Sequence, residues 1–115
     1  MSGTATRLGK VCAGISRYIT ESYDPALAPE TVLWRRVTKV CEESGEVWQA
    51  LAGMVGENPR KGVTHSQEDL IGELLDVALA ALGAVEHLVG DDGSSAARLD
   101  AKAETVLGRL GLVTA

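Results

Sequence analysis

Two pairs of carboxylates have the spacing that lets one face of a helix carry both members. Glu43 and Glu46 are three residues apart, and so are Glu73 and Asp76. Residues three apart share a helix face, so two antiparallel helices could bring both pairs to one point. Carboxylate oxygens suit divalent cations such as Mg²⁺, which in turn hold phosphate groups. The spacing alone is weak evidence, because the chain has 16 acidic residues among 115.

The surroundings of Asp76 in the sequence strengthen this interpretation. Asp76 is the one polar residue in the run from Leu74 to Val85, which reads LLDVALAALGAV. A helix that is apolar nearly all round is predicted to be buried. An unpaired buried charge is very costly, so we expect Asp76 to be paired or bound to a metal ion.

Basic residues flank the acids and could hold the phosphates of a nucleotide. The candidates are Lys39, Arg60, Lys61, Lys102 and Arg109. Lys39 falls on the same helix stripe as Glu43 and Glu46. In the alternative interpretation these bases are ordinary solvated charges, and Lys39 with Glu43 is a simple i,i+4 ion pair.

The elements that must position these residues read as four helices with no competing strand pattern. Apolar periodicity and breaks rich in Gly and Pro predict helices over about 6–21, 29–55, 66–89 and 95–110. Ser66 is a good N-cap, with Asp69 three residues on as in a capping box. Cys12 and Cys41 are predicted to face the core as free thiols. The fold class is therefore all-α and resembles a four-helix bundle.

The length of the chain fits a single domain over residues 1–115. Wide apolar helix faces indicate that further copies of the chain cover part of the surface. The net charge of −5 argues against a general nucleic-acid binder. The longest apolar run is too short to span a bilayer, and the polar stretch 1–10 does not resemble a signal peptide. We therefore expect a cytoplasmic protein that binds neither nucleic acid nor membrane.

The acidic pattern resembles that of a known family, the MazG-like nucleotide pyrophosphohydrolases of the all-α NTP pyrophosphatase superfamily. Glu43-x-x-Glu46, then 26 residues, then Glu73-x-x-Asp76 is similar to the family signature. The strings KVCEESGEVWQAL (39–51) and EDLIGELLDVALAAL (68–82) resemble its two motif helices. GENPRKGVTH (56–65) resembles a loop of short MazG-like proteins from actinobacteria and their phages. Lys102 and Arg109 resemble the basic pair on the late helix of the family.

The resemblance implies a Mg²⁺-dependent, or Mn²⁺-dependent, hydrolysis of a nucleoside triphosphate to the monophosphate and pyrophosphate. The four acids at 43, 46, 73 and 76 match the metal ligands, and the molecule would be a homodimer or homotetramer. We expect water to attack the α-phosphorus, with Glu46 or Glu42 as its base. Two alternatives are a catalytically silent nucleotide-binding or metal-binding regulator and a helical interaction module. The aromatic residues that could stack on a base have no clear place in the pattern; they are Trp34, Trp48, Tyr18 and Tyr23.

Overall fold

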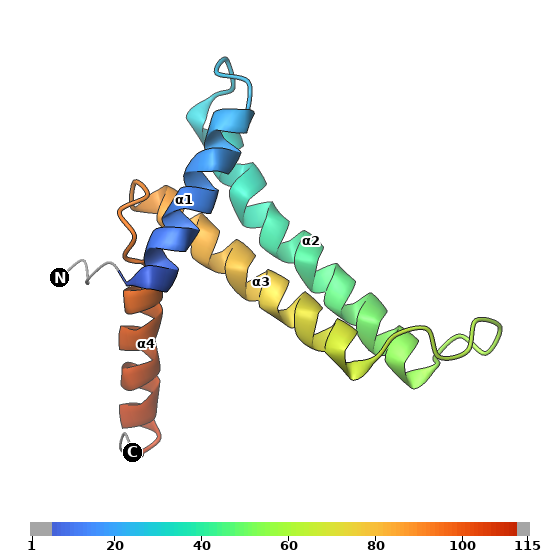
Figure 1. The fold of residues 1–115 in the computed structure, drawn as a ribbon. Coiled ribbons are helices and arrows are strands. Elements are labelled where there is room, and N and C mark those ends of the chain that lie inside the picture. The colour runs from blue at the N-terminus through green and yellow to red at the C-terminus, as the bar shows by residue number, and fades with distance from the viewer. Residues whose placement is uncertain (1–5, 113–115) are drawn as a thin grey trace. The chain divides into compact units, whose positions relative to one another are not determined.

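A computed structural model describes residues 6–112 of the chain. Within that range it contains four helices and no strand (Figure 1). The helices are α1 (Arg7–Ser22), α2 (Pro29–Val55), α3 (Gln67–Leu88) and α4 (Ser95–Arg109). The all-α prediction is confirmed, and each predicted boundary lies within about two residues of the observed one. The first five residues of the polar stretch 1–10 lie outside the described range.

Local capping signals explain where the helices begin and end. Pro29 occupies the first turn of α2, where its missing N–H costs nothing. Gly56 ends α2 in the left-handed conformation, with φ of 68°. At the start of α3 the Ser66 N–H donates to Asp69 at 2.8 Å, and the Asp69 N–H donates to the Ser66 hydroxyl at 3.1 Å. This reciprocal pair is the capping box that the sequence predicts.

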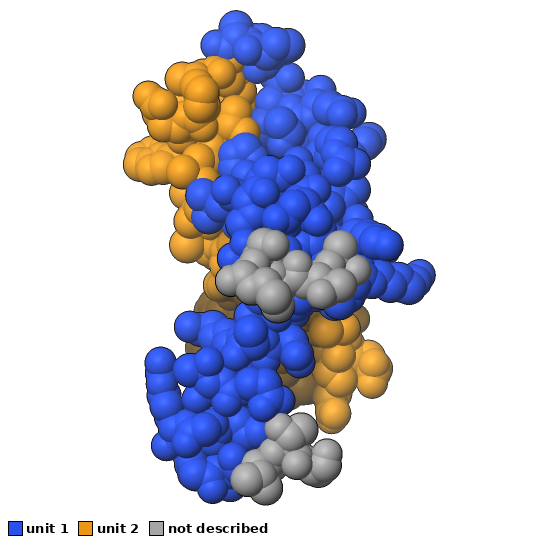
Figure 2. Space-filling view, turned by 90° about the vertical axis from the view of Figure 1, so that its left-hand side faces the viewer, with its two compact units in different colours: residues 1–26, 82–115 blue, residues 27–81 orange. Residues whose placement is uncertain are grey.

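The chain divides into two compact units, coloured separately in Figure 2. One comprises Met1–Ala26 and Leu82–Ala115, and the other comprises Leu27–Ala81. In the second unit, α2 and the first part of α3 run antiparallel, joined by the loop 56–66 (Figure 1). We call residues 27–81 the hairpin unit and the remainder the terminal unit. The acidic pairs lie in the hairpin unit, together with Lys39, Arg60 and Lys61.

The terminal unit is organised around Glu86, whose side chain is fully buried. Its two carboxylate oxygens accept the N–H groups of Gly93 and Ser95, each at 2.8 Å. Ser95 is the first residue of α4, so the carboxylate satisfies donors that the helix itself leaves unpaired. Cys12 is also buried, as predicted, and its burial together with the nearby Glu86 charge raises the pKa of the thiol.

The hairpin unit leaves much apolar surface uncovered. Cys41 is exposed, so its predicted place in the core is wrong. Leu74, Leu75 and Leu79 are also exposed, as is Asp76 itself. The predicted burial of the apolar run is therefore wrong for its first half, although Leu82 is buried. The physical reason is that a two-helix hairpin buries only the stripe that each helix turns toward the other.

None of the helices within residues 6–112 is both long and apolar enough to cross a membrane.

Candidate metal centre

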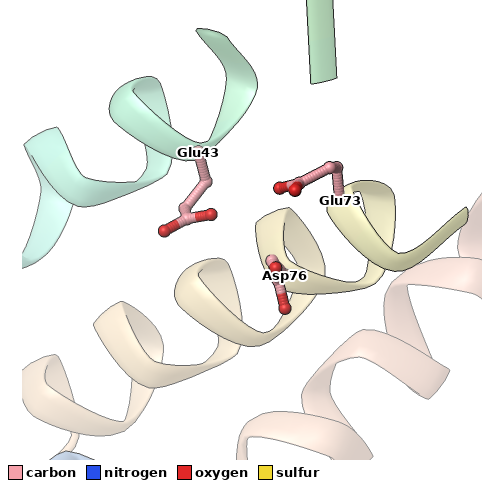
Figure 3. A group of neighbouring side chains, drawn as sticks. All are labelled: Glu43, Glu73 and Asp76. Atoms are coloured by element: carbon pink, nitrogen blue, oxygen red, sulfur yellow. The ribbon is translucent and has the colours of Figure 1, made fainter. Parts of the chain in front are cut away.

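Three carboxylates converge between the two helices of the hairpin unit. Glu43 extends from α2 toward α3, and Glu73 extends toward Glu43, with Asp76 on the next turn of α3 (Figure 3). One carboxylate oxygen of each residue lies within 4.8 Å of the others. The spacing of three residues places Glu73 and Asp76 on one face of α3, and the antiparallel pairing supplies Glu43 opposite them. Three of the four acids of the two predicted pairs therefore meet between the helices.

Glu46, the fourth acid of the pattern, borders the same cluster. The charge of Glu43 raises the pKa of the Glu46 carboxyl, and a hydrogen bond with Glu73 and the charge of Glu73 raise it further. A hydrogen bond between two carboxyl groups requires a proton on one of them. Carboxylates crowded in this way repel each other, and either protons or a cation can relieve the repulsion. We call Glu43, Glu46, Glu73 and Asp76 the acidic cluster.

One oxygen in the acidic cluster is buried without a donor. Oε2 of Glu73 is shielded from solvent and accepts no hydrogen bond from a donor group within residues 6–112. A buried acceptor of this kind is costly when unmet. The neighbours of this oxygen are other carboxylates, which are also acceptors and cannot satisfy it. A divalent cation is a suitable partner for all of them. The residues present therefore suit a hard cation with oxygen ligands, as the resemblance implies.

Lys39 provides positive charge beside the acidic cluster. Its ammonium group lies 3.2 Å from a Glu43 oxygen and 3.4 Å from a Glu42 oxygen. The hydrogen bond to Glu43 and the charge of Glu42 raise the pKa of Lys39. The Glu43 side chain is only 12% exposed, whereas that of Glu42 is 63% exposed. Glu42 is thus more exposed than Glu43, and it is not among the acids whose oxygens converge between the helices.

The other predicted phosphate-binding residues lie in two different places. Arg60 and Lys61 are exposed in the loop between α2 and α3, where the Arg60 N–H donates to Oδ1 of Asn58 at 3.0 Å. Lys102 and Arg109 are exposed on α4, in the terminal unit, two helical turns apart. The phosphate-binding roles of these four residues stay predictions.

Sequence reasoning missed the role of Glu86 and a cavity beside the loop that follows α2. Glu86 belongs to the same apolar helix as Asp76, yet it forms no i,i+3 pair with another acid. Its partners are backbone N–H groups, which cannot be recognised from the sequence because nearly every residue type has one. The cavity depends on how the loop folds back on α2, and loop composition alone does not specify that path.

Comparison of the chain with known protein families, with curated proteins and with solved structures found no match.

Proposed function

We propose that the protein is a metal-dependent nucleoside triphosphate pyrophosphohydrolase that releases a nucleoside monophosphate and pyrophosphate. The observation that carries the proposal is the convergence of Glu43, Glu73 and Asp76 within 4.8 Å, with Glu46 beside them. Crowded carboxylates, one of which has a buried oxygen without a donor, are unfavourable alone and suit a divalent cation. The resemblance of these acids to the MazG-like signature supports the same assignment.

The acidic cluster would hold Mg²⁺, or Mn²⁺ in its place, through the carboxylates of Glu43, Glu46, Glu73 and Asp76. The bound cation supplies charge neutralisation for the phosphates and lowers the pKa of water. Lys39 carries the positive charge nearest the acidic cluster and offsets charge on the outer phosphates. Arg60, Lys61, Lys102 and Arg109 are the further candidates for that role.

In the reaction, the oxygen of a water molecule bonds to the α-phosphorus, and the bond from that phosphorus to the bridging oxygen breaks. Pyrophosphate leaves with the electron pair, and Glu46 accepts the proton of the water. Glu46 is preferred over Glu42 because Glu46 borders the acidic cluster, whereas Glu42 is ion-paired with Lys39 on the surface.

The direct test is to incubate the protein with nucleoside triphosphates, with and without Mg²⁺, in water enriched in heavy oxygen. Phosphorus NMR should then show monophosphate and intact pyrophosphate, formed only with metal and with the heavy oxygen in the monophosphate. Release of inorganic phosphate, or the label in pyrophosphate, would contradict attack at the α-phosphorus. Binding of nucleotide with no product would favour the silent regulator.

A matched set of variants tests whether activity depends on the acidic cluster in particular or is lost when any acidic residue is replaced. Glu46→Gln and Asp76→Asn should abolish turnover while the helical circular dichroism is kept. Glu68→Gln changes an exposed acid on the first turn of α3, outside the acidic cluster, and should leave the rate within about twofold. Equal activity in all three variants would overturn the site assignment.

The proposed assembly is a homodimer or homotetramer of bundle-like modules, located in the cytoplasm. Exposed apolar side chains support it: Leu8, Val11 and Ile15 follow one face of α1, and Leu75 and Leu79 are exposed on α3. Soluble monomers seldom expose contiguous apolar patches of this kind. Light scattering coupled to size exclusion should report a mass of two or four chains. A monomer at micromolar concentration would contradict this part of the proposal.

A further inference from the structure

A cavity of about 400 Å³ lies in the hairpin unit, between the last turns of α2 and the loop that follows it. This volume falls within the range of sites that bind small molecules. Trp48 borders the cavity, and Gln49 and Asn58 line it as well. An aromatic plane beside amide donors and acceptors is a common combination in pockets that recognise a flat heterocycle.

The wall formed by the loop is held in place by specific contacts. The N–H groups of Thr64 and His65 donate to the carbonyl of Gly53 at 2.9 and 3.4 Å. A Cβ at Gly53 would collide with Nδ1 of His65 and lie 2.6 Å from Oγ1 of Thr64. The absence of a side chain at Gly53 therefore lets the loop reach α2.

The amide of Asn58 is oriented by its own turn. Its Oδ1 accepts the Arg60 N–H at 3.0 Å, which identifies Oδ1 and leaves the amide nitrogen as the donor side. Its backbone carbonyl accepts the N–H groups of Lys61 and Gly62, so the loop is tightly turned at this point. Contacts within the loop therefore define this wall of the cavity.

The cavity lies along α2 from the acidic cluster. Gln49 is three residues beyond Glu46, and Gly53 is seven residues beyond it, on the same stripe of the helix. Two helical turns correspond to roughly 10 Å along the axis. That separation is comparable to the reach of a nucleotide from its base to its outer phosphates.

We propose that this cavity binds the base of the nucleotide whose phosphates meet the acidic cluster, with Trp48 stacking on the base. The inference rests on the proposed function and adds the recognition of a nucleobase to it. A base fits the cavity better than a phosphate does, because Glu57 lines it together with Lys61 and the two charges offset each other. In this arrangement Lys61 would lie beside the base rather than beside the outer phosphates. Trp48 is 56% exposed, so its ring is accessible to a ligand.

Fluorescence tests the stacking without any turnover. Trp34→Phe leaves Trp48 as the sole tryptophan of the chain. Nucleoside monophosphates added without divalent cation should quench its emission in a saturable manner, while inorganic triphosphate should not. No saturable quenching by any of the common bases would overturn the proposal. Equal quenching by inorganic triphosphate would also overturn it, in favour of a phosphate site.

Kinetics provides the second test, with a matched control on the same helix. Trp48→Ala should raise KM roughly tenfold to a hundredfold, the effect expected for a lost base stack, and leave kcat within about threefold. Trp34→Ala removes a tryptophan that is 77% exposed and does not line the cavity, and should change neither constant. Trp48→Phe should recover most of the lost affinity. Equal KM values in the two alanine variants would contradict the base pocket, but they would not contradict the proposed hydrolase activity.

Discussion

The two places where α3 uses carboxylates differ in how those carboxylates are partnered. Glu86 is fully buried, and both of its oxygens accept backbone N–H groups at 2.8 Å. Glu73 is half-buried, and one of its oxygens has no donor within the described part of the chain. Its neighbours are the carboxylates of Glu43 and Asp76. Both residues are glutamates of α3, but only Glu86 has a hydrogen-bond donor for each of its carboxylate oxygens.

This difference shows that burial alone does not identify a functional carboxylate. Glu86 is the more buried group, and its hydrogen bonds account for it as a structural cap of α4. The acidic cluster is more exposed, and its carboxylates repel one another, with Lys39 ion-paired to Glu43. An unfulfilled requirement for positive charge is the better indicator of a binding site.

The largest expected effect is on catalysis. Asp76→Asn should lower kcat/KM about a hundredfold or more, because it removes a charge that the bound cation needs. In the metal-free protein the same variant should melt at or above the wild-type temperature, because one repulsive charge is gone. Steady-state kinetics and thermal unfolding in a chelator measure both. If Asp76→Asn were inactive because it is unfolded, Asp76 would be a structural carboxylate like Glu86, and the proposed difference between them would be wrong.

Removal of the Glu86 carboxylate should act on stability. Glu86→Ala leaves the N–H groups of Gly93 and Ser95 buried without an acceptor, at a cost of about 2–4 kcal/mol in the free energy of unfolding. Urea denaturation in a chelator measures the loss. Asp100→Asn, on the exposed surface of α4, provides the control. A loss no greater than that of the control would show that Glu86 is not the structural carboxylate that its hydrogen bonds indicate.

Stabilisation by Mg²⁺ should depend on the acidic cluster and not on Glu86. Addition of Mg²⁺ at ten times its Kd should stabilise the wild-type chain by about 1.4 kcal/mol, because only the folded chain assembles the acidic cluster. The increment should disappear in Asp76→Asn and persist in Glu86→Gln. Chemical denaturation at several Mg²⁺ concentrations gives the value. An increment kept in Asp76→Asn would place the cation elsewhere.

The smallest expected effect concerns Asp69, an exposed carboxylate that accepts hydrogen bonds from Ser66. The N–H and hydroxyl of Ser66 lower the pKa of Asp69 in the folded chain. Its stabilising contribution is therefore fully present above the ordinary pKa of an aspartate and is lost as the pH falls through the lowered value. Stability of Asp69→Asn relative to wild type, measured between pH 2 and 6 (about the range in which carboxyls titrate), should show the deficit shrinking in acid. A constant difference would contradict the capping role.

Local signals explain which parts of the fold could be predicted from the sequence. Pro29, Gly56 and the Ser66–Asp69 pair specify helix ends through contacts within a few residues, and those ends were predicted correctly. The meeting of Glu43 with Glu73 and Asp76 followed from helix periodicity and one antiparallel turn.

Features that depend on distant backbone could not be predicted in the same way. Asp76 was expected inside a buried run, but in the hairpin unit it is exposed beside Leu75. The partners of Glu86 are peptide groups seven and nine residues away, and any residue type supplies those. The cavity beside Trp48 depends on the contact of the loop with Gly53, which follows from the path of the chain rather than its periodicity.

The anchoring of the loop at Gly53 has a consequence for how this protein can diversify. Two N–H groups and a missing Cβ fix the end of the loop, while residues 57–63 between the anchor and α2 bear none of the acidic cluster. Helices α2 and α3 carry the acidic cluster, and the loop forms part of the cavity. Substitutions or insertions in the loop can therefore alter which ligand is accepted without disturbing the carboxylates. In the proposed hydrolase, substrate selectivity would therefore change through the loop, independently of the helices that carry the acidic cluster.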